Sequence, residues 1–586
     1  MIPPPKPRTR KLTIIAQDPS VTIDGKILTV QIEIPAEEIA PGPRGYRVQV
    51  TDYDISTGTL YRARAYDPLQ SDHYPDPYEN AAKRHQDKVF LTDPQFHQQN
   101  VYAIVMKTLA RFEFALGRRV NWAFPGHQIN VAPHAFADAN AFYSKHEQAL
   151  VFGYFQGLTG APVFSCLSHD VVAHETTHAL LDGLRERYTD PSSPEQAGFH
   201  EGFADIVALL SVYSLPDIVA RLLGANSTEK DLIDPGELTA DILRKSVLFG
   251  MAEQMGQEMS SGVRGGRGDA LRRSISLLPL TPADEPDKYE TSPEYQEPHR
   301  RGEILVAAVM SAFLGVWLKR IERLKKGKAA GSKLDRQLVV EQGADAAEQL
   351  LTMCIRALDY APPTDLQFCD FLSALITADR EAVPDDSKYG YRQILLDCFA
   401  SYGLYPPTSA EEDHGGWGMV DNSDLAYDRS HFESMLRDPD EVFRFIWENR
   451  NPLGLYEDAY TKVISVRPCL RLGPDGFTLR ETVAEYIQML TLTPLEVESL
   501  NISVPKDMPA DQEITLYGGG ALVFDEYGRL KYHARNRILN IERQTQRLKY
   551  LWQYGFYDDE QGVQNPFARL HLQRALNLPT NQMEKF

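Results

Sequence analysis

Hydrophobic and polar residues alternate along the first part of the chain, which is the period expected of half-buried β-strands. Apolar residues at 28, 30, 32 and 34 alternate with polar ones, and the pattern resumes from Tyr46 to Val50. Asp24-Gly25, just before the first run, is typical of a hairpin turn. Residues 67–93 are rich in proline and aspartate and are predicted to form a linker. We therefore expect a small β-rich N-terminal unit with its linker over residues 1–94.

The next part of the chain mixes helical and strand-like patterns. Apolar residues recur at helical spacing or in short runs, which predicts helices over 95–116, from about 168 and over 201–213, and strands over 129–132 and 149–155. A Gly/Arg-rich segment and an acidic, proline-rich segment, 261–268 and 281–298, are predicted to be loops. Residues 95–300 are therefore expected to form an α/β lobe.

Helical spacing dominates after residue 300 and predicts a helical lobe over residues 301–405. Its helices are expected at 304–323, 337–358, 365–378 and 389–402. The longest apolar stretch, Ile304–Leu318, is shorter than the roughly 20 residues that a membrane span needs. We therefore expect a buried core helix there and no membrane span.

The remaining residues, 406–586, are predicted to form an α+β extension whose role the pattern does not indicate. A helix is expected over 481–490, and the alternation from Ile514 to His533 predicts a β-meander. Gly518-Gly519-Gly520 lacks the Lys-Ser/Thr of a phosphate-binding loop and is interpreted as a bulge or turn. The fold class expected for the whole chain is α+β.

The composition is that of a globular protein and limits the classes of partner that we expect. Of 586 residues, 43% are hydrophobic and 24% charged, and the net charge of −20 argues against nucleic acid or an anionic membrane as the main partner. Five cysteines without CxxC spacing indicate neither a disulfide framework nor a cysteine zinc site. No apolar run of signal-peptide length precedes Gln17, so a cytoplasmic location is expected. The oligomeric state stays open.

The strongest chemical signal is His174-Glu175-Thr-Thr-His178, followed by Glu201. Residues four apart share one face of a helix, so the two histidines can bind one ion while Glu175 serves as a base. Catalytic zinc usually takes three protein ligands, and Glu201 supplies the third. Asp205, four residues further on, is placed to accept the outer N–H of a zinc-bound histidine. We therefore predict a Zn²⁺ site.

With these residues the sequence resembles the thermolysin-like family of gluzincin metallopeptidases, whose pattern is HExxH followed by a Glu-x-x-x-Asp helix. Further segments agree with the family in order and spacing. Asp170–Glu175 matches the approach to the family's active helix, and Asn140–Tyr143 matches its substrate-binding edge strand. Residues 268–272 match the segment of a substrate-binding arginine, and His299 matches a second catalytic histidine. The resemblance covers about residues 95–404 and implies a two-lobed catalytic unit.

The resemblance also implies roles for these residues. A zinc-activated water attacks a peptide carbonyl and Glu175 moves its proton, while Tyr188 and His299 donate hydrogen bonds to the carbonyl oxygen. Tyr188 is one residue out of the family's register. Arg272 is implied to bind a substrate carbonyl, and Glu294 to be the acidic partner of His299. Asn140 and Ala141 are implied to bind the peptide as strand residues, and Val171 and Leu271 to line an apolar pocket.

Other positions depart from the family's pattern. His200 precedes the third ligand where Asn is usual, which changes a contact next to the metal ligands. Secreted members bind Ca²⁺ beside the active helix, and Asp170 matches one ligand, but Val212 stands where another carboxylate is expected. His134 and three other histidines, His127, His146 and His169, are interpreted as structural or surface residues.

The resulting hypothesis is a zinc-dependent endopeptidase that acts on a peptide or protein substrate and prefers a hydrophobic residue after the cleaved bond. One alternative is a gluzincin aminopeptidase, but the sequence contains no Gly-x-Met-Glu-Asn segment of the kind that binds an amino terminus. The other is a catalytically silent peptidase-fold scaffold that binds peptides. The intact set of Glu175, both histidines and Glu201 favours the enzyme.

Overall fold

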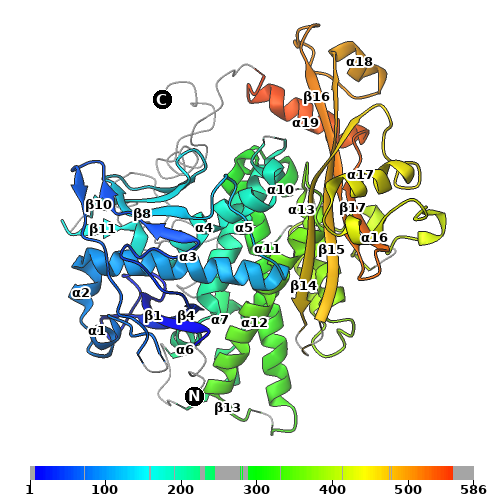
Figure 1. Ribbon diagram of the computed structural model, residues 1–586. Coiled ribbons are helices and arrows are strands. Elements are labelled where there is room, and N and C mark those ends of the chain that lie inside the picture. The colour runs from blue at the N-terminus through cyan, green and yellow to red at the C-terminus, as the bar shows by residue number, and fades with distance from the viewer. Residues whose placement is uncertain are drawn as a thin grey trace, which may run out of the picture.

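The computed structural model describes residues 7–557 except 71–72, 158–159, 191, 225–230, 245–277, 279, 281–287, 330, 412–413, 474–475 and 477. The described part of the chain is a mixed α+β structure with several sheets, as the sequence predicts. In Figure 1 a mixed sheet and the long helix α3 lie on one side, a layer of helices occupies the middle, and a second sheet lies on the other side.

The first large sheet mixes parallel and antiparallel strands in the order β11-β10-β8-β5, with β9 also paired to β10. β10 runs parallel to β8 and antiparallel to β9 and β11, and β8 is parallel to β5. The strands are β5 (Val48–Val50), β8 (Ile129–Phe136), β9 (Ala141–Ser144), β10 (Ala149–Gln156) and β11 (Pro162–Phe164). β9 is therefore an edge strand of this sheet.

The N-terminal segment shares this sheet and its core. The predicted hairpin turn is present, since Asp24 and Gly25 both have positive φ, 50° and 72°. β1 and β4 pair along their full length, and their buried side chains belong to one hydrophobic cluster with α3 and the central helices. The elements are β1 (Thr9–Ile15), β2 (Thr22–Ile23), β3 (Lys26–Ile27), β4 (Thr29–Pro35) and α3 (Pro94–Leu116). Residues from both sides of position 94 thus form one core.

The central layer consists of long helices, which pack against one another (Figure 1). They are α4 (His169–Leu184), α5 (Pro194–Tyr213), α11 (Pro298–Lys325), α12 (Arg336–Ala357), α13 (Phe368–Ala382) and α14 (Tyr391–Ala400). Among the described helices, α11 alone is long and apolar enough to span a membrane, but 83% of its apolar window is buried inside the protein. This burial fits the expected core helix.

Two of these helices begin earlier than the apolar periodicity predicts. α5 starts at Pro194, where the side chain of Ser193 accepts a hydrogen bond from the backbone of Gln196. α11 starts at Pro298, where the side chain of Glu297 accepts from the first backbone N–H groups. A helix start formed by a capping side chain and a proline requires no apolar residue, so the apolar periodicity does not indicate the first turns of these helices. Glu201 consequently lies inside a helix, and His299 lies in a first turn rather than in a loop.

The C-terminal sheet is antiparallel in the order β14-β15-β16-β17. Its strands are β14 (Tyr460–Leu472), β15 (Thr478–Leu492), β16 (Ile514–Phe524) and β17 (Leu530–Asn536). The predicted helix over 481–490 is wrong, because these residues form the middle of β15 between two partner strands. Gly518–Gly520 is also neither bulge nor turn, since it pairs in regular register with β15. The meander predicted over 514–533 is confirmed.

Buried ion pairs join this sheet to the helical layer. Arg471 on β14 binds the carboxylates of Asp359 and Glu481, and Arg118 donates to Asp359 from the end of α3. The remaining described elements are shorter and lie around these layers: β6 (Tyr53–Asp54), β7 (Thr59–Leu60), α1 (Glu79–Lys83), α2 (Asp87–Thr92), α6 (Pro216–Gly224), β12 (Leu232–Ile233), α7 (Ala240–Arg244), α10 (Lys288–Thr291), β13 (Leu334–Asp335), α15 (Thr408–Glu411), α16 (Phe432–Met435), α17 (Pro439–Glu448), α18 (Pro494–Ser499) and α19 (Ile541–Gln553).

Candidate metal centre

Two helices carry the predicted zinc ligands and place their donor atoms together. His174 and His178 lie one turn apart on α4, with their Nε2 atoms 2.9 Å apart. Glu201 reaches them from α5, with Oε2 3.6 Å from His174 Nε2 and Oε1 3.6 Å from His178 Nε2. One donor atom from each residue lies within 4.8 Å of the others, and all three residues are buried. Two imidazoles and a carboxylate are a known ligand set for catalytic zinc, so these three residues could hold a metal ion of this kind.

The outer nitrogen of each ligand histidine is bound by a neighbouring side chain. His174 Nδ1 lies 2.8 Å from Asp205 Oδ1, the contact that the sequence predicts. Because a carboxylate accepts, Nδ1 carries the hydrogen and Nε2 presents its lone pair to the ligand group. His178 Nδ1 lies 2.8 Å from Nδ1 of His200. Burial, partly offset by Glu201, lowers the pKa of His200 to about 4, so its neutral ring can accept the hydrogen of His178.

Glu175 lies beside the ligands, with its carboxylate held by the backbone of the edge strand. Its Oε1 is 4.0 Å from His174 Nε2, and its Oε2 accepts a hydrogen bond of 3.1 Å from the backbone N–H of Tyr143 on β9. The side chain is buried. This contact, which the sequence pattern does not indicate, orients the carboxylate toward the ligand group.

A helix from the predicted second lobe brings His299 to the same place. A Cβ on Gly202 of α5 would lie 2.8 Å from the carbonyl oxygen of Gly302 in α11, so the two helices touch backbone to backbone. His299 Nε2 lies 3.2 Å from Glu201 Oε2, and His299 Nδ1 lies 2.8 Å from Glu297 Oε1. Burial by itself lowers the pKa of His299, but the two carboxylates outweigh it and raise the pKa to about 9.

The carboxylate that binds His299 is Glu297 and not the expected Glu294. Glu297 is the N-cap of α11, and its side chain also accepts from the backbone N–H groups of His299 and Arg300. Glu294 lies earlier, on the 3-10 turn Pro293–Gln296, with Oε1 3.3 Å from Arg300 Nη2. Pro298 at the first helical position is a helix-start signal, which would have identified Glu297 as the residue facing the first turn.

Of three other predicted residues, the structure describes only Tyr188. Tyr188 is buried on the 3-10 turn Glu186–Thr189, and its hydroxyl donates a hydrogen bond of 2.8 Å to the carbonyl oxygen of Pro362. Donation to a substrate oxygen therefore requires this hydroxyl to change partner. Arg272 and Leu271 lie outside the described residues, so their predicted roles stay predictions.

The predicted substrate-binding strand is present as β9, beside Glu175. The carbonyl oxygen of Asn140 accepts from the backbone N–H of Gly153 at 2.9 Å, and the N–H of Ala141 donates to Asn140 Oδ1 at 2.9 Å. These two backbone groups thus have partners within the chain. Val171 is half-buried on α4 and packs against the main hydrophobic cluster, and its role in lining a pocket stays a prediction.

Asp170 and Val212 do not form the calcium site that the resemblance suggests. Asp170 Oδ1 accepts from Ser168 Oγ at 2.7 Å and from the backbone N–H of Val171 at 2.9 Å. Val212 is buried and has no side-chain oxygen to offer. Calcium needs six to eight oxygen ligands, so we assign none to this position.

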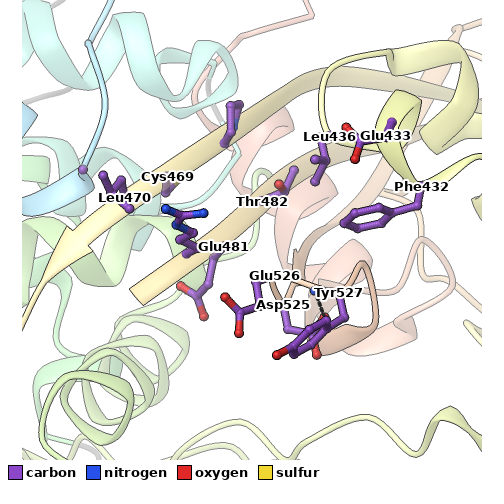
Figure 2. A pocket seen from close by; sticks show the side chains of 13 residues that line it. Phe432, Glu433, Leu436, Cys469, Leu470, Glu481, Thr482, Asp525, Glu526 and Tyr527 are labelled. Carbon is purple, nitrogen blue, oxygen red and sulfur yellow. Dashed lines mark hydrogen bonds between the residues drawn. The ribbon is translucent and has the colours of Figure 1, made fainter. Parts of the chain in front are cut away.

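A surface pocket lies away from this centre, in the C-terminal unit. Figure 2 shows its lining, in which Phe432 and Leu436 face residues of β14 and β15 and the turn at Asp525–Tyr527. Glu481 at its floor is already bound to Arg471 and Lys531. The pocket includes none of the candidate zinc ligands.

Comparison with known proteins found no family model that matches the chain and no matching curated protein. The resemblance to thermolysin-like peptidases therefore depends on the individual motif residues and on the geometry that they adopt.

Proposed function

We propose that this protein is a zinc-dependent peptidase with a two-lobed, thermolysin-like catalytic unit. The observation that carries the proposal is the buried group of His174, His178 and Glu201, with Glu175 beside it. The contact of His174 with Asp205 supports it, because outer carboxylates orient metal-binding imidazoles. Three metal ligands with an adjacent base are the groups that metal-assisted hydrolysis requires.

The chain's own residues supply the proton transfers. Zinc, when bound by the three ligands, lowers the pKa of a water toward about 7 and polarises the substrate carbonyl. Glu175 accepts the proton of the attacking water and passes it to the leaving amine. The backbone N–H of Tyr143 holds one oxygen of Glu175, which orients the carboxylate for both transfers.

His299 is the proposed donor to the carbonyl oxygen as that oxygen gains charge. Its ring is brought to the ligand group by α11 and is held from the other side by Glu297. An imidazole N–H in a buried site stabilises developing negative charge strongly, because little water screens it. Tyr188 and Arg272 remain predicted contributors on the basis of the resemblance alone.

Endopeptidase action is the form of the proposal that we favour. An aminopeptidase needs a segment that binds the substrate's amino terminus, and the sequence lacks the Gly-x-Met-Glu-Asn pattern. The resemblance assigns peptide binding to the edge strand β9 next to Glu175, where an extended substrate would have to replace the internal partners of Asn140 and Ala141. The preference for a hydrophobic residue after the cleaved bond depends on Val171 and Leu271.

The test is metal analysis together with cleavage of a peptide library by the wild type and by Glu175→Gln. We expect zinc in both proteins and a loss of cleavage of about 10²–10⁴-fold in the variant. The control is Glu147→Gln, an exposed glutamate that pairs with His146; it should cleave like the wild type. Cleavage that survives in Glu175→Gln, or a protein without zinc, contradicts the proposal. Zinc without any cleavage by the wild type indicates a peptide-binding scaffold instead.

A further inference from the structure

A second buried group of metal-ligand residues lies in the α/β part of the molecule. His97 comes from α3, His134 from β8 and Cys166 from the 3-10 turn Ser165–Leu167, which directly precedes α4. One donor atom from each lies within 4.8 Å of the others. Their exposed fractions are 1%, 1% and 0%. Neither the spacing of these residues nor the proposed peptidase chemistry assigns them a role.

The hydrogen bonds of the two histidines determine where their protons are. His97 Nε2 lies 3.0 Å from the carbonyl oxygen of Phe90, which can only accept, so this nitrogen carries a hydrogen. His134 Nδ1 lies 2.9 Å from Asp52 Oδ1, and this carboxylate also accepts from Gln98 Nε2 at 3.0 Å. An ionised carboxylate only accepts, so His134 Nδ1 carries a hydrogen as well.

The inner nitrogens of the two rings therefore face each other with lone pairs. His97 Nδ1 and His134 Nε2 are 2.7 Å apart. Two lone pairs this close repel unless a cation lies between them, which can be a proton or a metal ion. The Nε2 atoms of His174 and His178 in the candidate zinc centre approach in the same way, 2.9 Å apart, with an outer nitrogen bound to a carboxylate.

We infer that His97, His134 and Cys166 bind a second zinc ion. Cys166 supplies a third donor of a suitable kind, because nitrogen and sulfur are the donors that zinc prefers, at about 2.0–2.1 Å and 2.3 Å. Binding forms the Zn–S bond and breaks the S–H bond of Cys166, whose proton leaves to solvent. Tetrahedral coordination separates two nitrogens by about 3.3 Å, so the imidazoles move apart by a few tenths of an ångström.

The proposed ligands are held by neighbouring groups. Asp52 and the Phe90 carbonyl orient the two rings from outside, as outer partners do in known zinc sites. The ring of Phe164 packs against both imidazoles, with centroids 4.8 Å and 5.2 Å away. The ion would join α3, β8 and the turn that leads into α4, and so would fix the start of the helix that carries His174. This inference does not depend on the peptidase proposal.

Cobalt substitution of the full-length chain tests the inference, because Co²⁺ bound to a thiolate has a near-ultraviolet charge-transfer band. The candidate centre on α4 contains no sulfur and cannot produce it. We expect this band and two ions per chain in the wild type, and no band with one ion in Cys166→Ser. The matched control is Cys354→Ser, another fully buried cysteine, which should retain the band and both ions.

A reciprocal variant separates the two sites. His178→Asn should lose one ion and keep the thiolate band, even if it cleaves no peptide. A wild type without the band overturns the inference whether or not the Cys166 variant folds, and means that a proton lies between His97 and His134. A band that disappears in Cys354→Ser also overturns it, since the thiolate would then come from elsewhere.

Discussion

Gly202 on α5 and Gly302 on α11 meet backbone to backbone, since a Cβ built on Gly202 would lie 2.8 Å from the carbonyl oxygen and 3.1 Å from the Cα of Gly302. No side chain fits between them. The contact joins the helix that carries Glu201 to the helix whose first turn carries His299. The spacing of these two helices therefore determines whether the predicted donor reaches the metal ligands.

Replacing Gly202 by a larger residue should separate α5 from α11. We expect Gly202→Ala to lower the free energy of unfolding by about 1–3 kcal/mol, because overpacking a rigid contact forces the backbone to move. Peptide cleavage should fall as well, since His299 moves away from Glu201. Urea unfolding and cleavage rates measure the two effects. Gly126→Ala, at an exposed position that meets only the Phe124 ring at 3.3 Å, should change neither.

Asp205 should determine how tightly the metal is held. Asp205→Asn removes the carboxylate that accepts from His174 Nδ1, which weakens the ring as a ligand. We expect zinc affinity to fall by about 10–100-fold, measured by competition with a chelator. Asp217→Asn, on the neighbouring helix α6, is the control and should bind zinc like the wild type. Unchanged affinity in Asp205→Asn would show that Asp205 does not support the ligand.

Asp379 on α13 should make stability depend on pH. Burial raises the pKa of this carboxyl to about 7 from 3.8, although Arg392 Nη1 lies 3.2 Å from it and opposes the shift. Between these two values the folded chain binds one proton more than the unfolded chain, so stability falls as pH rises. The contribution is complete below pH 3.8 and is lost as pH passes 7.

The measurement compares the free energy of unfolding of the wild type and Asp379→Asn across this range. The variant should gain on the wild type by at most about 1.4 kcal/mol for each pH unit, because Asn cannot lose a proton. Asp385→Asn changes an exposed aspartate nearby whose pKa is lowered by hydrogen bonds from Ser387, so it should leave the pH dependence of the wild type intact above pH 3.8. A constant difference between the wild type and Asp379→Asn would refute the assignment.

The metal ligands were predictable because most of their geometry is local. His174 and His178 share a face of α4 through their spacing alone, and Asp205 follows Glu201 at the same spacing on α5. Pairing α4 with α5 brings Glu201 to the histidines, and the three-ligand rule for catalytic zinc had already indicated Glu201 as the third ligand. The contact of Glu297 with His299 is local as well, because Glu297 is the N-cap of α11 and lies two residues before His299.

β15 shows why part of the fold could not be predicted. Its residues from Glu481 to Gln488 are buried on both faces, so apolar side chains do not alternate there as they do in a half-buried strand. A short segment in which apolar residues do not alternate fits a buried helix and a central strand equally well. Its partners β14 and β16 decide between the two, and they are distant in sequence.

The sequence by itself determined the identity of the candidate zinc ligands and base, because helical periodicity acts over a few residues. Only the tertiary structure decided two of the groups that surround them, His200 on His178 and the Tyr143 backbone on Glu175. It also brought His97, His134 and Cys166 together from three separate elements. Such contacts arise when helices and strands pack side by side, and no local spacing records which residues will meet.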